Sequence, residues 1–195
     1  MPKPETKAGL PILGFPDREA LEAWLESESG RSAGIWLRLA RKESAVASVS
    51  KAEAIDAALC FGWIDGQLDR YDELSWLMRL TPRRPRGKWS ERNRTRALEL
   101  IEEARMRPRG LAEVEAAKAD GRWDVAYAPQ SKAEVPPDLQ AALDADPEAA
   151  AFFATLKGAN RYAILYRIGD AKRPETRAAR IAKFVAMCAR GETLH

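Results

Sequence analysis

The chain has almost no histidine and very little cysteine. Its one histidine among 195 residues is His195, the last residue, where chains usually fray. This excludes a His-based catalytic triad, an HExxH zinc site and a three-histidine metal site. The two cysteines, Cys60 and Cys188, are far apart, so there is no CxxC redox or zinc motif. We therefore expect no metal site and no cofactor, and any chemistry must depend on carboxylates and arginines.

Long apolar runs are also missing. The first fifteen residues contain Lys3, Glu5 and Lys7 and lack the apolar core of a secretory signal. No segment approaches the ~20 apolar residues that cross a bilayer. Both cysteines lie in apolar patterns, which predicts two buried free thiols. These absences indicate a cytoplasmic protein with no membrane insertion.

Hydrophobic residues make up 46% of the chain, enough for a packed core. An alternating pattern predicts a strand over 35–39, and two further strands over 64–71 and 75–81 form a hairpin. Helix starts are predicted at Asp17, at Ser50 with Glu53, at Ser90 and at Asp146, because these residues have capping side chains. The expected fold is α+β, with a small antiparallel sheet of about three strands packed with helices. An all-helical C-terminal subdomain follows it.

A proline-rich stretch over 126–137 has no hydrophobic periodicity, which is typical of a linker. It predicts two domains, an N-terminal α+β domain over 1–128 and a helical C-terminal domain over 136–195. Proline also marks predicted helix starts at Pro137 and Pro174.

Positive charge is concentrated in two segments. The formal net charge of the chain is only +3, but residues 79–96 carry +7 and residues 167–183 carry +4. The rest of the chain is therefore acidic. A near-neutral total thus conceals two basic segments, each at the predicted start of a helix.

Cations are unfavourable at a helix N-terminus unless an anion is nearby, because the helix dipole is positive there. Unpaired N–H groups with Arg and Lys side chains make an anion site. The alternative is that these arginines pair with carboxylates elsewhere in the chain. No phosphate-binding glycine motif is present. The candidate ligand-binding residues are Arg83, Arg84, Lys88, Trp89, Ser90, Arg92, Asn93, Lys172, Arg173, Arg177 and Arg180.

A catalytic site has weaker support in the sequence. Asp65 and Asp69 are four residues apart on one predicted strand, so alternation places both side chains on the same side, and paired carboxylates can divide acid and base roles. Asp65 is a weak catalytic candidate, since Asp65-Gly66 can equally mark a β-bulge. Tryptophans in a small domain are usually core residues, and Trp89 is singled out because it lies among the arginines.

Three segments resemble the YdeI/OmpD-associated proteins, also called bacteriocin-protection or OmdA proteins. They are Ala58–Gly66 (ALCFGWIDG), Thr81–Asn93 (TPRRPRGKWSERN) and Ala171–Ile181 (AKRPETRAARI). They occur in order along most of the chain. The resemblance implies a connection with resistance to bacteriocins or cationic antimicrobial peptides, and a YjbR/CyaY-like N-terminal part by analogy of fold.

Three hypotheses for function remain open. The first is a binding protein for an anion, either a nucleic-acid backbone or a phosphorylated or carboxylated metabolite. The second is an enzyme on an anionic small molecule with Asp65 as general base. The third is an adaptor whose basic surface meets an acidic protein partner in antimicrobial-peptide resistance. We favour a binding protein over an enzyme.

Overall fold

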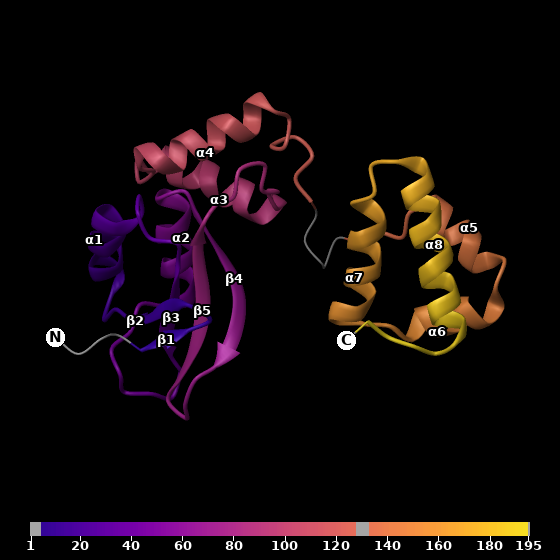
Figure 1. Cartoon of the computed structure of the whole chain (residues 1–195), viewed down its shortest axis with the longest axis horizontal. Coiled ribbons are helices and arrows are strands. Elements are labelled where there is room, and N and C mark those ends of the chain that lie inside the picture. Colours follow the sequence, from indigo (N-terminus) through magenta and orange to yellow (C-terminus); the bar gives the residue numbers. More distant parts are fainter. Residues whose placement is uncertain (1–4, 128–132, 195) are drawn as a thin grey trace. The chain divides into compact units, whose positions relative to one another are not determined.

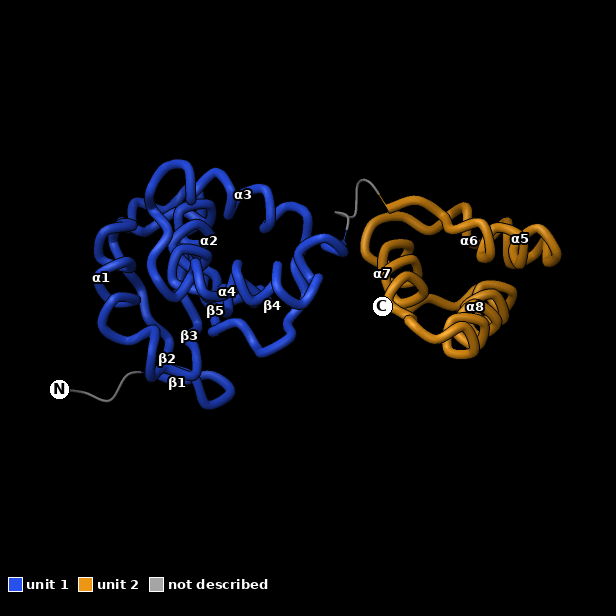
Figure 2. The backbone as a smooth tube through the Cα atoms, turned by 90° about the horizontal axis from the view of Figure 1, so that it is seen from above, with its two compact units in different colours: residues 1–127 blue, residues 128–195 orange. Residues whose placement is uncertain are grey.

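The computed structural model describes residues 5–127 and 133–194. The chain divides into two compact units, residues 1–127 and 128–195 (Figure 2). Part of the predicted linker, residues 128–132, lies outside the described residues, as does His195. No described helix is both long and apolar enough to cross a membrane.

Unit 1 contains a five-stranded mixed sheet and four helices (Figure 1). The elements in chain order are β1 (Thr6–Lys7), β2 (Leu10–Gly14), α1 (Arg18–Glu28), β3 (Ile35–Ala40), α2 (Lys51–Cys60), β4 (Trp63–Arg70), β5 (Ser75–Pro82), α3 (Glu91–Glu102) and α4 (Pro108–Ala119).

The strand order is β1-β2-β3-β5-β4. The predicted strand and hairpin are confirmed as β3, β4 and β5, and the α+β class is confirmed. The sheet is larger than the predicted three strands and is not wholly antiparallel, because β2 pairs parallel to β3 across α1. The β2 strand contains Pro11 and its outer neighbour has only two residues, which explains why neither strand gave a clear pattern.

Capping side chains begin these helices as predicted. The Asp17 carboxylate accepts from the backbone N of Ala20, and Ser50 forms a reciprocal capping box with Glu53. The α3 helix begins after Ser90 as predicted and ends at Glu102, and the chain turns at Ala104 with φ of 55°. The α4 helix begins at Pro108, which occupies the first helical position.

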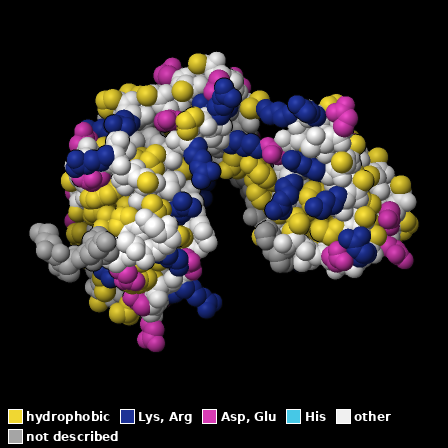
Figure 3. All heavy atoms as spheres, viewed as in Figure 1, with side chains coloured by type: hydrophobic (Ala, Val, Ile, Leu, Met, Phe, Trp, Pro, Cys, Tyr) yellow, Lys and Arg dark blue, Asp and Glu magenta, His cyan; other side chains and the backbone are white. Residues whose placement is uncertain are grey.

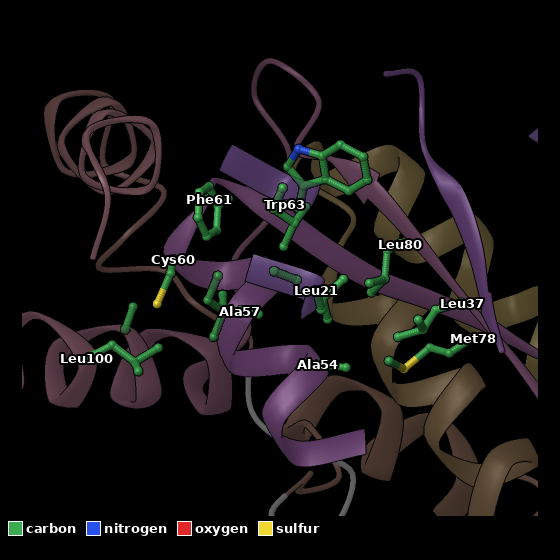
Figure 4. Close-up of a cluster of buried hydrophobic side chains, with 14 of the residues drawn as sticks. Leu21, Leu37, Ala54, Ala57, Cys60, Phe61, Trp63, Met78, Leu80 and Leu100 are labelled. Carbon is green, nitrogen blue, oxygen red and sulfur yellow. The ribbon is translucent and has the colours of Figure 1, made fainter. Parts of the chain in front are cut away.

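The core of unit 1 lies between α2 and one face of the sheet. The α2 residues Ala54, Ala57 and Cys60 are buried. Figure 4 shows Ala54 near Met78 of the sheet and Cys60 near Leu100 of α3. The alternate face of the sheet has a smaller buried cluster, made by Leu10, Trp36 and Leu77. Helices therefore cover one face of the sheet. The β4–β5 hairpin forms one edge of the sheet.

Unit 2 is helical, as predicted. It contains α5 (Pro137–Asp144), α6 (Pro147–Thr155), α7 (Gly158–Gly169) and α8 (Pro174–Ala189). The α8 helix contacts the other three, and its buried residues are Ile181, Phe184, Met187 and Cys188. Both cysteines are buried free thiols.

Candidate anion-binding site

The middle of the first basic segment forms a loop, residues 83–90, between β5 and α3. We call it the basic loop. Its turn is closed by a hydrogen bond from the backbone N of Gly87 to the oxygen of Arg84 at 2.8 Å, and Arg86 adopts φ of 60°. The Arg122 side chain donates from Nη1 to the Gly87 oxygen at 2.7 Å. The loop therefore has a defined backbone conformation held from outside the segment.

The α3 helix start is tied to the end of unit 1. Ser90 accepts through Oγ from the backbone N of Asn93 at 3.1 Å. Tyr127 accepts from the backbone N of Glu91 at 2.9 Å and donates its own N to the Trp89 oxygen at 3.0 Å. These bonds satisfy two of the first N–H groups of α3, so the side chains around this helix start offer more for an anion than its backbone does.

Arg83 and Trp89 are buried within the loop. Arg83 is 7% exposed and Trp89 is 2% exposed, and the Arg83 Cζ lies 3.6 Å from the Trp89 ring centroid. The indole also meets Trp123 in an edge-type contact, with the ring centroids 4.9 Å apart. Trp89 therefore has no exposed face on which a nucleobase could stack.

Arg84, Lys88 and Arg92 are exposed, unlike Arg83. Figure 3 shows Lys and Arg side chains gathered on the surface of each unit. Arg84 and Arg92 make no ion pair with any described residue. They are cations on an ordered loop and helix start with their donors directed to solvent or to a ligand.

Two further arginines of the first segment, Arg94 and Arg96, have structural contacts. Arg94 donates from Nη1 to the Trp123 oxygen at 3.0 Å. Arg96 forms a bidentate pair with Asp56 of α2, at 2.6 and 2.8 Å, and also contacts Glu99 and Glu103. The alternative that these arginines pair with carboxylates is therefore correct for Arg96, whereas Arg94 binds a backbone oxygen.

The second basic segment divides in the same way at the start of α8. Lys172 and Arg173 are exposed, and Arg173 occupies the N-cap position without a side-chain cap. Arg177 instead binds Asp138 through Nε and Nη2, at 2.5 and 2.8 Å, and donates from Nη1 to the Ile168 oxygen. Arg180 donates to the Arg167 oxygen. Arg177 and Arg180 therefore hold the C-terminal end of α7 against α8.

A groove of about 570 Å³ lies between α5 and α8. Small and aliphatic side chains line most of it, together with Asp138, Asp146 and Arg177. The Arg177 guanidinium is already paired with Asp138. The groove therefore offers no free cation to an anionic ligand.

The sequence prediction that Asp65 and Asp69 share one side of the strand is wrong. Asp65 pairs with Leu80 and Asp69 with Leu77, and the register shifts between Asp65 and Leu68. Opposed residues share a face, and Leu80 and Leu77 belong to the two opposite clusters. The extra residue of the predicted bulge thus separates the two carboxylates, and Asp69 instead pairs with Lys7 at 2.5 Å.

Sequence reasoning did not identify Glu113 or Arg122 as neighbours of the basic loop. Glu113 lies on α4 next to Gly62, since a Cβ at Gly62 would be 3.2 Å from its Cγ. Neither residue belongs to a charge run, so only the fold brings them together with Arg83. No metal-ligand cluster of His, Cys, Asp or Glu occurs within the described parts of the chain.

Two family comparisons match the chain. Residues 13–113, just over half of the chain, are similar to the family described as "Domain of unknown function (DUF8412)". Residues 132–191 are similar to the family described as "Bacteriocin-protection, YdeI or OmpD-Associated". The first match lies within unit 1 and the second within unit 2. No curated protein and no solved structure shows significant similarity to the chain.

Proposed function

We propose that this chain, which belongs to the DUF8412 family and has a C-terminal segment similar to the YdeI/OmpD-associated family, binds a nucleic-acid backbone through exposed cations. The cations lie at the start of α3 and at the start of α8. The cytoplasmic location expected from the sequence is part of this proposal.

The observation that carries the proposal is the division of the basic side chains into two groups. Buried or half-buried arginines such as Arg96 and Arg177 are paired within the protein. Within the two basic segments, five exposed side chains form no ion pair with any described residue, and these are Arg84, Arg86, Arg92, Lys172 and Arg173. Several unpaired surface cations on two segments suit a chain of phosphates, whose neutralisation releases counterions.

A phosphorylated or carboxylated metabolite at these surface cations is the runner-up. The groove beside α8 does not favour it, because the lining contains two aspartates and a guanidinium that is already paired. Small ligands usually need a concave site with convergent polar groups, which exposed side chains of a loop do not supply. Two other hypotheses stay predictions. One is an enzyme on an anionic small molecule with Asp65 as general base, and the other is an adaptor for an acidic protein partner.

Fluorescence anisotropy with labelled single-stranded and duplex oligonucleotides tests the proposal. Affinity should fall steeply between about 50 and 200 mM salt. The double variant Arg84→Ala/Arg92→Ala removes two phosphate contacts, so the slope of log K against log salt should become shallower by about 1.4–1.8.

The matched control is Arg31→Ala/Arg190→Ala. It removes the same charge from two exposed arginines that already pair with Glu28 and Glu192, so it should leave the slope unchanged. If both double variants changed the slope equally, binding would depend on the net charge of the protein and not on Arg84 and Arg92. Absence of binding by the parent protein at about 50 mM salt would overturn the proposal.

A further inference from the structure

The basic loop contains three buried nitrogen donors that lack acceptors. Nε and Nη2 of Arg83 are inaccessible to solvent and make no hydrogen bond, and the same holds for Nε1 of Trp89. Only Nη1 of the Arg83 guanidinium is engaged, with the Lys88 oxygen at 3.4 Å. Since buried donors almost always have partners in folded proteins, a cluster of orphan donors on two stacked side chains indicates an acceptor that residues 5–127 and 133–194 do not provide.

The free edge of Arg83 has the geometry that recognises oxyanions. Nε and Nη2 of a guanidinium present two parallel N–H bonds that match the two oxygens of a carboxylate or phosphate. Other arginines of this protein use the same two atoms to hold a carboxylate side chain, namely Arg31 with Glu28, Arg96 with Asp56, Arg177 with Asp138 and Arg190 with Glu192. Arg83 presents this edge with no carboxylate on it, although it is more buried than any of them.

The surroundings keep Arg83 charged without neutralising it. Burial lowers the pKa of the Arg83 guanidinium to about 10, while the negative charges of Glu113 and Asp65 oppose that decrease. At neutral pH the side chain therefore remains a cation. A buried cation without hydrogen-bonding partners is costly, and an incoming anion would remove that cost.

The position of Arg83 is fixed from several sides. Its backbone N donates to the Gly62 oxygen at 3.0 Å, between α2 and β4. Its guanidinium is packed on Trp89, which is backed by Trp123. The edge is thus pre-organised on a rigid scaffold, which lowers the entropic cost of binding.

We propose that Arg83 and Trp89 form an internal binding site for one oxyanion, the carboxylate or phosphate group of a small molecule. The group accepts from Nε and Nη2 of Arg83, and Nε1 of Trp89 is the remaining unpaired donor of the stacked pair. The site does not depend on the proposed nucleic-acid binding, because it uses buried donors and not the exposed cations. The donors are inaccessible to solvent, so entry of the oxyanion requires a local opening of the basic loop.

The test is a titration of the full chain with inorganic phosphate, and separately with acetate, at constant ionic strength set by sodium chloride. The readout is the indole N–H resonance of Trp89, one of six tryptophans in the chain, identified by its loss in Trp89→Phe. A saturable shift of this resonance is expected with at least one anion. Saturation by phosphate alone identifies a phosphate group as the ligand, and saturation by acetate identifies a carboxylate.

Arg83→Lys keeps the charge but removes the two-pronged edge. Its affinity for the saturating anion should fall at least about tenfold, the loss expected for one charge-assisted hydrogen bond. The neighbouring exposed Arg84→Lys is the matched control and should bind as the parent does. If Arg83→Lys does not fold, Trp89→Phe is the second variant. It keeps an aromatic ring but removes the indole N–H donor, so its affinity for the anion in a thermal-shift titration should be severalfold lower than that of the parent.

Two results would overturn the proposal. One is a Trp89 resonance that neither anion shifts, which would assign the orphan donors to bound water. The other is saturable binding that Arg83→Lys and Trp89→Phe leave unchanged. Loss of oligonucleotide binding in the exposed-cation variant bears only on the surface function, so the two proposals fail independently.

Discussion

Arg177 of α8 and Asp138 of α5 form a two-pronged ion pair 39 positions apart in the sequence. The same guanidinium donates from its third nitrogen to the Ile168 oxygen at 3.0 Å, at the end of α7. A single side chain thus joins three of the four helices of unit 2, and its role is structural.

Arg177→Ala should lower the unfolding temperature of unit 2, because it leaves Asp138 unpaired and the Ile168 oxygen without this donor. Arg177→Lys should restore only part of the loss, since an ammonium group cannot bind the carboxylate in the same bidentate way. Thermal unfolding followed by far-UV circular dichroism measures the unfolding temperature of each variant and of the parent.

Arg190→Ala is the control for this experiment. It removes an exposed arginine of the same unit that pairs with Glu192 two residues away, and such local pairs contribute little. Equal destabilisation by Arg177→Ala and Arg190→Ala would contradict the structural role of Arg177.

The Arg177–Asp138 pair also predicts a pH dependence. The hydrogen bond from Arg177 lowers the pKa of Asp138 below its ordinary value, which is about 3.9 in an unfolded chain. A carboxyl whose folded pKa is lowered contributes stability above the unfolded pKa, and this contribution is lost as pH falls through the folded pKa. The stability difference between the parent and Asp138→Asn should therefore be full at neutral pH and decrease only in acid, below about pH 4. A difference that is constant down to strong acid would show that the charge of Asp138 is irrelevant.

Gly110→Ala should destabilise unit 1. An added Cβ would collide with the Cys60 oxygen and lie 2.7 Å from the Leu59 oxygen, both backbone atoms that cannot move freely at the end of α2. Overpacking of this kind costs about 1–3 kcal/mol. All six tryptophans lie in unit 1, so denaturant unfolding followed by tryptophan fluorescence reports on this unit alone.

Gly66→Ala is the matched control within unit 1. The nearest atom to its added Cβ is the Arg79 oxygen at 3.7 Å, an ordinary contact, so the change should stay within about 0.5 kcal/mol. If Gly110→Ala were equally mild, α4 would not pack against α2 as closely as described.

The thiols should be unreactive in the folded protein. Burial raises the pKa of Cys60 to about 11 and also raises the pKa of Cys188. At pH 8, Cys60 is therefore a thiolate in only about one molecule in a thousand, and the thiolate is the reactive form. A thiol reagent should label neither residue until denaturant is added. Rapid labelling of the native protein would indicate that one of these sites opens readily.

Local signals in the sequence predicted much of the fold. The starts of α1, α2, α3 and α6 follow from single capping residues, Asp17, Ser50, Ser90 and Asp146, whose side chains bond to nearby backbone N–H groups. The alternation of Trp76, Met78 and Leu80 likewise specifies β5 and the face it buries.

The parts that could not be predicted depend on pairing between distant segments. The parallel partner of β3 is a short strand containing Pro11, which has no strand pattern of its own. The bulge after Asp65 was anticipated, but its effect on Asp69 needed the observed register. The role of an arginine depends on which carboxylate the fold brings to it, so charge counting could not separate Arg177 from Arg173.

The bridge between Ser90 and Tyr127 has a consequence for avidity. It anchors the last described residue of unit 1 beside the first basic helix start, and only a short stretch of chain separates it from α5. Once a long ligand is bound to the first basic segment, its binding to the second segment is intramolecular. With a short linker, the effective concentration of the second segment near the bound ligand reaches the millimolar range. The two basic surfaces would then bind such a ligand bivalently. Cutting the chain between the two units should lower the affinity for this ligand to that of a single unit.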